Sequence, residues 1–344
     1  MAKAEDVASK VIREACEKHP DLPTMTLANI VYRGANKKLF TSIGAVRHRI
    51  SYARGRKTGG NSDRRFVSKK AVPIKDTSGS SSVPYAYRAP KSHTQQYTEY
   101  VVHGAQRVLR LSDIHYPFHD ERALEAAINY GIKKDPTILL LDGDIIDCHS
   151  ISRYMKDPRE RYTETEMRMV GQEIEQFKKL FPKARIIWKE GNHEQRLVTY
   201  LLTKAPELYG LPMLDIPGLV TMFNSPDTMT GVEWVNDNRV IRIGKLACLH
   251  GHEYRGGGGV NPARWLFLRT GESAIVGHFH RTSEHSEPNL SRDQMACWST
   301  GGLCELQPGY QRHSKHNHGF AYIEVEDSGM FRVKNIRVLD GRIV

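Results

Sequence analysis

The sequence lacks several features that would place the protein in a common class. It contains no run of about 18 apolar residues, and its start does not have the basic-then-apolar pattern of a secretory signal. Its 5 cysteines are odd in number and form no CxxC pair, which disfavours a disulfide framework and a cysteine-rich zinc site. No GxxxxGK[ST] phosphate loop occurs, and no GxGxxG follows a predicted strand. These absences predict a cytoplasmic protein that does not span a membrane and is not a nucleotide-driven motor.

Positive charge is concentrated in the first hundred residues. The chain of 344 residues has a formal net charge of +11, and residues 1–100 carry 19 Lys and Arg against 8 Asp and Glu. The remainder carries 31 of each kind. The length suggests two domains of about 150 residues each, and the charge distribution indicates that they meet different partners. A basic segment of this kind is typical of contact with nucleic acid.

Residues 1–55 have the periodicity of a small all-α module. Apolar residues recur at helical spacing over residues 4–18, and residues 26–33 predict a second short helix. Ser42 is a suitable N-cap for a third helix. The apolar stripe of that helix consists of Ile43, Val46, Ile50 and Ala53. Three helices joined by short turns would form a unit that resembles a helix-turn-helix module.

The third predicted helix is the candidate nucleic-acid contact. Its spacing leaves Arg47, Ser51 and Arg54 on one outward face, with Arg49 beside them. Such a face is expected of a helix that meets phosphates or base edges. The alternative is a solvated basic face on a bundle that docks a protein. We favour nucleic acid as the partner.

Residues 56–104 differ in composition from the segments on either side. They are rich in Gly, Ser, Pro, Lys and Arg, and few apolar residues recur at any period, which predicts a flexible basic linker. Four tyrosines are spaced along the segment: Tyr85, Tyr87, Tyr97 and Tyr100. They are suited to stack on bases, or equally to pack on the following domain as an ordered arm.

Residues 105–344 contain five short polar motifs. In chain order, they hold Asp113 and His115, Gly143 and Asp144, Gly191 to Glu194, His250 and His252, and Gly277 to His280. Four apolar runs, at 108–111, 138–141, 186–188 and 246–249, predict buried strands that end just before the first four motifs. Ligands bind at the carboxyl ends of strands in open α/β sheets, so we expect the motifs to converge on one crevice. Their carboxylates, amide and imidazoles suit a pair of transition-metal ions.

These motifs resemble those of the calcineurin-like metallophosphoesterases, whose pattern is DxH, GD, GNH(D/E), H and GHxH. The resemblance covers residues 105–340 and implies an α/β sandwich of two sheets flanked by helices. Predicted helices at 120–133 and 164–180, with predicted strands at 232–236, 239–250, 318–325 and 330–338, agree with that fold.

The resemblance also implies a dinuclear metal site with one shared carboxylate. The implied ligands are Asp113, His115 and His280 for the first ion, Asn192, His250 and His278 for the second, and Asp144 as the bridge. Mn²⁺ is the favoured metal, with Fe, Zn²⁺ and Mg²⁺ as alternatives. The residue types cannot choose among these metals.

Residues beside these ligands have implied roles in catalysis and substrate binding. By resemblance, His193 would contact the phosphate and protonate or stabilise the leaving oxygen, and Asp147 would orient a neighbouring group. His252 is either an additional ligand or a residue of the substrate pocket, and we favour the pocket. Because Arg suits bidentate contact with phosphate, Arg196 and Arg281 are the candidate substrate clamps.

The sequence thus predicts a phosphoesterase with two metal ions, in which a metal-bridging hydroxide attacks phosphorus in line. We expect it to act on nucleic acid, as a nuclease or an end phosphatase that the basic module brings to its substrate. The alternative is a protein or small-molecule phosphomonoesterase whose module binds a protein partner. A metal-stabilised scaffold without catalysis is disfavoured by His193. The layout also resembles bacteriophage-encoded members of the family, which would place the protein in the host cytoplasm.

Overall fold

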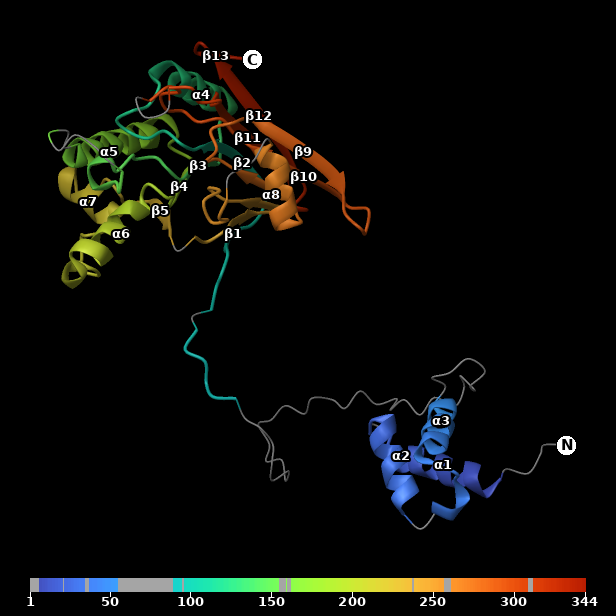
Figure 1. Cartoon of the computed structure of the whole chain (residues 1–344). Coiled ribbons are helices and arrows are strands. Elements are labelled where there is room, and N and C mark those ends of the chain that lie inside the picture. The colour runs from blue at the N-terminus through green and yellow to red at the C-terminus, as the bar shows by residue number, and fades with distance from the viewer. Residues whose placement is uncertain are drawn as a thin grey trace. The chain divides into compact units, whose positions relative to one another are not determined.

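The computed structural model describes residues 6–20, 22–34, 37–54, 89–94, 96–154, 159, 162–236, 238–256, 261–308 and 312–344. The chain divides into two compact units, Met1–His93 and Thr94–Val344. In its described residues the first unit is helical, and the second combines helices with two sheets (Figure 1). Within the described ranges, no helix is long and apolar enough to cross a bilayer.

The smaller unit is built from three α-helices, as its sequence predicts. They are α1 (Val7–Lys18), α2 (Thr24–Arg33) and α3 (Ile43–Ala53), with a 3-10 turn η1 (Lys37–Leu39) before α3. Ser42 caps α3, because its hydroxyl oxygen accepts a hydrogen bond from the backbone N–H of Ala45 at 3.1 Å. Val46 and Ile50 of α3 pack in one core with Ile12 and Leu27. The predicted apolar stripe of the third helix therefore faces the other two helices.

The resemblance of this unit to a helix-turn-helix is not supported by the connection between its helices, and the expectation for Arg54 is wrong. The connection from α2 to α3 spans residues 34–42, which is longer than the turn of about three or four residues in a helix-turn-helix. Arg54 does not lie on an outward face but is buried, and its guanidinium donates to the carbonyls of Leu22 at 2.7 Å and His19 at 2.9 Å. Arg54 therefore satisfies backbone acceptors between α1 and α2, and it is not available to nucleic acid.

The other candidate contacts of α3 are more accessible. Arg47 is exposed and Ser51 is half-buried. Arg49 is exposed, and its guanidinium lies 3.3 Å from the Asp6 carboxylate before α1. Arg56 and Lys57, which the sequence places just beyond α3, lie outside the described residues.

The larger unit is a sandwich of two sheets. The seven-stranded sheet has the order β13-β12-β11-β2-β3-β4-β5, and the six-stranded sheet has the order β1-β6-β7-β8-β10-β9. Strands of the first are β2 (Gln106–Leu111), β3 (Ile138–Asp142), β4 (Arg185–Lys189), β5 (Val232–Val235), β11 (His318–Val325), β12 (Phe331–Leu339) and β13 (Arg342–Ile343). Strands of the second are β1 (Tyr100–Val102), β6 (Ile241–Ile243), β7 (Leu246–Cys248), β8 (Ala274–Val276), β9 (Ser283–Pro288) and β10 (Gln294–Ser299). Strands β2 to β5 run parallel, so their carboxyl ends share one edge.

Helices cover the outer faces of both sheets (Figure 1). The helices of this unit are α4 (Glu121–Lys134), α5 (Thr163–Leu180), α6 (Gln195–Lys204), α7 (Ile216–Phe223) and α8 (Pro262–Thr270), with 3-10 turns η3 (His149–Ile151) and η4 (Pro206–Leu208). Helices α4, α5 and α7 pack on the seven-stranded sheet, and α8 packs on the six-stranded one. This arrangement confirms the predicted two-sheet fold flanked by helices.

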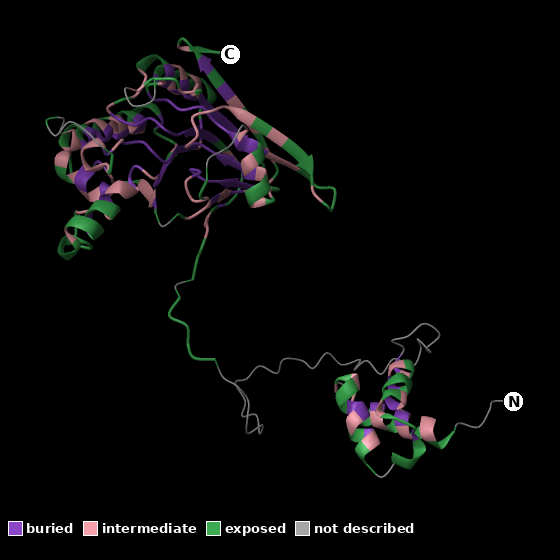
Figure 2. Cartoon of the chain, in the orientation of Figure 1, coloured by how far each residue is buried: buried purple, intermediate pink, exposed green. Residues whose placement is uncertain are grey.

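Alternation of side chains along the strands separates the apolar layers. In β2, Val108 packs between the sheets with Ile241 and Ile275, whereas Leu109 and Leu111 pack under the helices on the outer face. The central strands β3, β7 and β8 are accordingly buried on both faces, whereas the edge strands β9, β12 and β13 are largely exposed or half-buried, as are the outer sides of the helices (Figure 2). Burial on both faces explains why the central strands are continuous apolar runs in the sequence.

The end of the expected linker belongs to this unit. Strand β1 pairs in parallel with β6 at the edge of the six-stranded sheet, so residues 100–102 are ordered. The Tyr97 hydroxyl accepts from the backbone N–H of Val240 at 2.9 Å, and the Tyr100 hydroxyl donates to Glu233. Tyr97 and Tyr100 therefore pack on the larger unit as an ordered arm, which was one of the two alternatives for the tyrosines of this segment. Tyr85 and Tyr87 lie outside the described residues.

Arg110 forms a buried ion pair within the seven-stranded sheet and joins this sheet to the six-stranded one through two further hydrogen bonds. Arg110 in β2 and Asp142 at the end of β3 are fully buried, and the Arg110 Nε lies 2.5 Å from an Asp142 carboxylate oxygen. The same guanidinium donates to the Thr300 hydroxyl at 3.0 Å and to the Leu249 carbonyl at 3.3 Å. Because Leu249 follows β7 and Thr300 follows β10, Arg110 ties the ends of four strands together.

Candidate metal centre

The polar motifs of the larger unit converge at the carboxyl ends of strands from both sheets. Asp113, Asp144 and Asn192 follow β2, β3 and β4 of the seven-stranded sheet. His250 follows β7 and His278 follows β8 of the six-stranded sheet. The expected single crevice is therefore formed by both sheets together.

The backbone at these positions is constrained. Asp113, His115, Asp144, His278 and His280 all have positive φ angles, between 50° and 60°. Such a conformation costs on the order of 1–3 kcal/mol for a non-glycine residue, and it persists where the surrounding structure enforces it. The strain turns these five side chains out of their loops and into the crevice.

A glycine permits the close approach of two of these loops. Gly143 has a φ of +83°, and a Cβ added to it would lie 2.5 Å from the His250 Nδ1. Any larger residue would push the His250 loop away from Asp144. The glycine before Asp144 is therefore part of the site.

The first set of predicted ligands is assembled around Asp113. The His280 Nε2 lies 3.1 Å from an Asp113 carboxylate oxygen, and the rings of His115 and His280 are 5.3 Å apart between centroids. The His115 Nδ1 is 3.1 Å from the Asp147 carboxylate, which directs its Nε2 inward. That Nε2 is buried, has no hydrogen-bond partner among the described residues and lies 3.9 Å from the Asp144 carboxylate.

The second set is assembled around Asp144. The His250 Nδ1 donates to the Asp142 carbonyl at 2.8 Å, and its Nε2 points at the Asp144 carboxylate from 3.1 Å. Ligand atoms of Asp144, His250 and His278 lie within 4.8 Å of one another. The Asn192 side-chain oxygen is buried and has no partner in the described part of the chain. Buried acceptors without partners are costly, and a cation would satisfy them.

The electrostatics of the centre favour bound cations. Burial would raise the pKa of Asp144, but the facing imidazoles, His250 foremost, hold that pKa well below its usual range. Burial likewise opposes protonation of His250, yet Asp144 and Asp113 raise its pKa to about 10. Burial lowers the pKa of His278 to about 4, so this imidazole is neutral and able to coordinate. The residues present therefore fit a pair of divalent metal ions.

Asp147 and His193 lie together beside the predicted ligands. The His193 Nδ1 is 2.9 Å from the Asp147 backbone carbonyl, and an Asp147 carboxylate oxygen contacts both His193 and His115. Arg196 donates from Nη1 to the Asp147 carbonyl at 2.6 Å, and its Nη2 lies 2.9 Å from the His193 Nε2. Asp147 thus orients one predicted ligand and the predicted acid at once.

Two further predicted substrate residues lie elsewhere around the centre. The His252 ring is 5.4 Å from that of His250, both of its nitrogens are buried without a hydrogen-bond partner among the described residues, and burial lowers its pKa to about 4. Arg281 is half-buried directly after His280. Sequence motifs did not predict that Cys304 lies near the metal centre, but its sulfur is 3.5 Å from the His280 Nδ1.

Glu194 positions the loops of the site, a role that the motif pattern alone does not reveal. Its carboxylate accepts hydrogen bonds from the backbone N–H groups of Gly191 at 2.9 Å, Asp144 at 3.0 Å and Ile145 at 2.8 Å. It is fully buried. One side chain therefore fixes the loop that carries Asn192 against the loop that carries Asp144.

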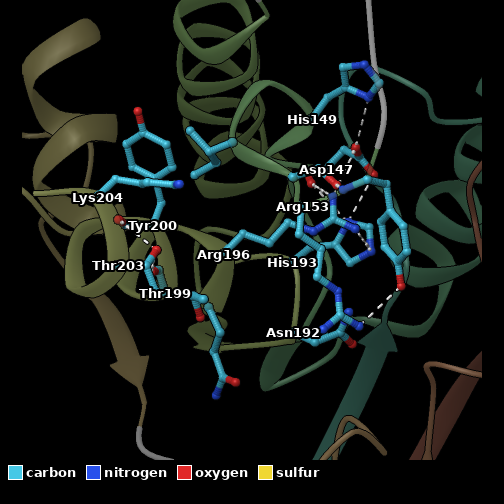
Figure 3. A pocket seen from close by; sticks show the side chains of 14 residues that line it. Asp147, His149, Arg153, Asn192, His193, Arg196, Thr199, Tyr200, Thr203 and Lys204 are labelled. Atoms are coloured by element: carbon cyan, nitrogen blue, oxygen red, sulfur yellow. Dashed lines mark hydrogen bonds and ion pairs between the residues drawn. The ribbon is translucent and has the colours of Figure 1, made fainter.

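A large cavity opens beside this centre. It has a volume of about 1140 Å³, and its described lining includes Asp147, Asn192, His193 and Arg196 (Figure 3). Arg281 and His252 are not among the described lining residues. Of the predicted substrate clamps, Arg196 alone thus borders this cavity within the described part of the chain.

Comparisons with known proteins agree with this geometry. The family model described as Calcineurin-like phosphoesterase matches residues 106–302. The chain is 30% identical over 247 residues to the Gene 54 protein of Mycobacterium phage L5, which is 64% of this chain and 90% of that protein. It is 28% identical over 196 residues to the Gene 54 protein of Mycobacterium phage D29, which is 52% of this chain and 70% of that protein. A dimetal phosphatase from Danio rerio shares 13% identity over 67% of this chain and 95% of its own, with a TM-score of 0.35, which is too low to carry an argument.

The contacts of Glu194 predict that Glu194→Gln weakens metal binding. An amide group cannot accept all of the hydrogen bonds that the carboxylate accepts, so the loops of Asn192 and Asp144 would shift. We expect affinity for Mn²⁺ to fall about 10- to 100-fold, as it does when residues that orient ligands are changed. Calorimetric titration of the full chain with Mn²⁺ measures this, with the exposed Glu164→Gln as the matched control. Equal affinities in the two variants would show that Glu194 has no such role.

Proposed function

Because the chain belongs to the calcineurin-like phosphoesterase family and is a metal-dependent phosphoesterase of phage type, we propose that it binds two divalent ions, Mn²⁺ by preference, and hydrolyses phosphate esters in nucleic acid. The observation that carries the metal assignment is that the buried His115 Nε2 and Asn192 side-chain oxygen have no hydrogen-bond partner among the described residues, while the His250 Nε2 faces the Asp144 carboxylate from 3.1 Å. They surround the carboxylate of Asp144, which would serve both ions.

The residues around the ions have distinct tasks in this proposal. Two bound divalent ions supply an activated water and neutralise charge on the phosphoryl oxygens. Asp147 holds the rings of His115 and His193, so neither has to reorient when the substrate arrives. Arg196 brings a guanidinium to the cavity side of the centre, where an anionic ester would enter.

His193 would act at the leaving oxygen only after Arg196 moves. In the structure the His193 Nε2 is in hydrogen-bond contact with Arg196, and burial lowers the pKa of His193, so the ring is neutral and accepts at Nε2. A bound phosphate competes for the Arg196 guanidinium. The proposed consequence is that the substrate binds Arg196 and frees Nε2. The freed Nε2 would then take up a proton from solvent, beside the Asp147 carboxylate, before giving it to the leaving oxygen.

The choice of nucleic acid as the substrate rests on charge. The excess of positive charge in residues 1–100 equals the net charge of the whole chain, and Arg47 on α3 is exposed without a hydrogen bond or ion pair to any described residue. The long connection between α2 and α3 means that helix-turn-helix geometry does not support this choice.

We place the reaction in the host cytoplasm, because the relatives are phage proteins and all five cysteines are free and buried.

The proposal predicts that Asp144→Ala abolishes hydrolysis of bis(p-nitrophenyl) phosphate with Mn²⁺ in excess. The loss should be at least about a thousandfold, because several kcal/mol of charge stabilisation disappear. The exposed Asp227→Ala is the control and should retain full activity. A panel of single-stranded and duplex DNA, RNA, nucleotides and phosphopeptides then ranks the substrates, with Asp144→Ala as the blank. The metal assignment would be refuted by an Asp144→Ala protein that keeps most of its activity.

The role of the basic module predicts a salt-dependent interaction with DNA. Affinity of the full chain for DNA should fall linearly in a plot of log K against log salt, because phosphate contacts release counterions. Arg47→Gln should remove one phosphate contact and make the slope less steep by about 1. Lys18→Gln on α1 removes the same charge and should leave the slope unchanged. Absence of DNA binding even at low salt would contradict this role and favour a protein partner for the module.

A further inference from the structure

The cavity beside the metal centre continues along helix α6. Its described lining begins at Asn192 and His193, passes Arg196 and ends at Tyr200 and Lys204, and Figure 3 shows Arg196 between the two ends. Arg196 and Lys204 are eight residues apart in one helix, which corresponds to about 12 Å along the axis. The cavity is thus too long for a single phosphate group.

The spacing of residues in α6 gives this cavity a uniform wall. Residues three and four apart share one face of a helix, and the residues of α6 that line the cavity follow this spacing. They are Arg196, Thr199, Tyr200, Thr203 and Lys204. One face of α6 therefore presents cations at both ends, with hydroxyl groups and an aromatic ring between them.

The segment after η3 adds a further cation and aromatic ring to the cavity lining. Arg153 lies over the ring of Tyr154, with its guanidinium carbon 5.3 Å from the ring centroid. Tyr154 is 63% exposed and Tyr200 is 43% exposed, so both rings offer surface to a ligand. Aromatic rings of this kind stack on unpaired bases.

Charge in the described lining favours a polyanion. Arg153, Arg196 and Lys204 contribute three cations, and the only carboxylate among the described lining residues is Asp147. That carboxylate is already engaged by His115 and His193. The Thr199 hydroxyl adds a donor suited to phosphate or sugar oxygens, whereas the Thr203 hydroxyl donates to the Thr199 carbonyl at 2.7 Å and offers a ligand only its oxygen as an acceptor.

We propose that this cavity is a binding groove for single-stranded nucleic acid. The inference rests on the proposed function and names its substrate more closely. The scissile phosphate lies at the metal centre against Arg196, the adjoining base stacks on Tyr200, and Lys204 contacts a phosphate further along the strand. A duplex does not fit this arrangement, because its bases are stacked on one another and do not present their faces to Tyr200 or Tyr154.

Kinetics on substrates of increasing length test the groove in the full-length enzyme with Mn²⁺. The substrates are bis(p-nitrophenyl) phosphate, which is too short to span from Arg196 to Lys204, and single-stranded oligonucleotides of two to six residues. For the wild-type protein we expect kcat/KM to rise with length. The ratio of kcat/KM for the hexanucleotide to that for the small diester should fall roughly tenfold in Tyr200→Ala, through loss of stacking, and also in Lys204→Gln.

Matched controls remove the same groups outside the cavity. Tyr209 is exposed beyond α6 and Lys183 is exposed before β4, and neither is among the described lining residues. Tyr209→Ala and Lys183→Gln should keep the wild-type ratio. Circular dichroism of each variant verifies that the fold is retained.

The possible outcomes separate this inference from the proposed function. Hydrolysis of the small diester without any length preference, or with equal ratios in all four variants, would overturn the groove and leave the phosphoesterase assignment in place. Cleavage of duplex as fast as single strand, or a preference for phosphopeptides that depends on Tyr200, would also overturn it. A wild-type protein that cleaves no phosphodiester would overturn the proposed function and the groove with it.

Discussion

The structure depends on the buried ion pair between Arg110 and Asp142. Removing two charges from water costs several kcal/mol for each ion, and a pair of apolar residues would often stabilise a core equally well. This pair lies where it supports the site. The guanidinium of Arg110 holds the carbonyl just before His250, and the backbone carbonyl of Asp142 holds the His250 ring. Through these two contacts, the pair holds the loop that follows β3 at hydrogen-bond distance from the loop that carries His250.

The charges of the metal centre and of the cavity beside it differ in sign. At the centre, Asp113 and Asp144 are buried among imidazoles, and burial without a counter-charge would be unfavourable. Beside the centre, the described lining of the cavity is mainly cationic, and the first hundred residues hold the whole charge excess of the chain. Bound cations would satisfy the carboxylates of the centre, and an anionic chain would satisfy the cationic residues of the cavity lining. This is why we connect the metal centre and the nucleic acid in one account.

Much of the fold was predictable because its strands and helix caps depend on local sequence patterns. The runs before Asp113, Asp144 and Asn192 are apolar on both faces, and that pattern is typical of central parallel strands. The cap at Ser42 is equally local. The run at 239–250 proved to be two antiparallel strands, β6 and β7, with a turn at Gly244.

Features that depend on distant residues were not predictable. Glu194 contacts backbone groups about 50 positions earlier in the chain, and Arg54 contacts carbonyls more than 30 positions earlier, so neither burial has a local signature. Arg110 interrupts an apolar run, and its partners at 249 and 300 become neighbours only in the sandwich. The sequence left the end of the linker open between a flexible segment and an ordered arm, because β1 is short and is held by pairing with β6 rather than by its own apolar pattern. The connection before α3 is longer than the sequence predicts because it contains the 3-10 turn η1.

The central claim is that Asp144 is shared by two metal ions. Electron paramagnetic resonance of the Mn²⁺-loaded full chain tests it most directly, because two ions about 3.5–4 Å apart are magnetically coupled. The account predicts a coupled spectrum at two Mn²⁺ per chain, which Asp144→Asn converts to that of isolated ions. A wild-type spectrum of isolated Mn²⁺ at saturating metal, or a coupled spectrum that persists in Asp144→Asn, would contradict it.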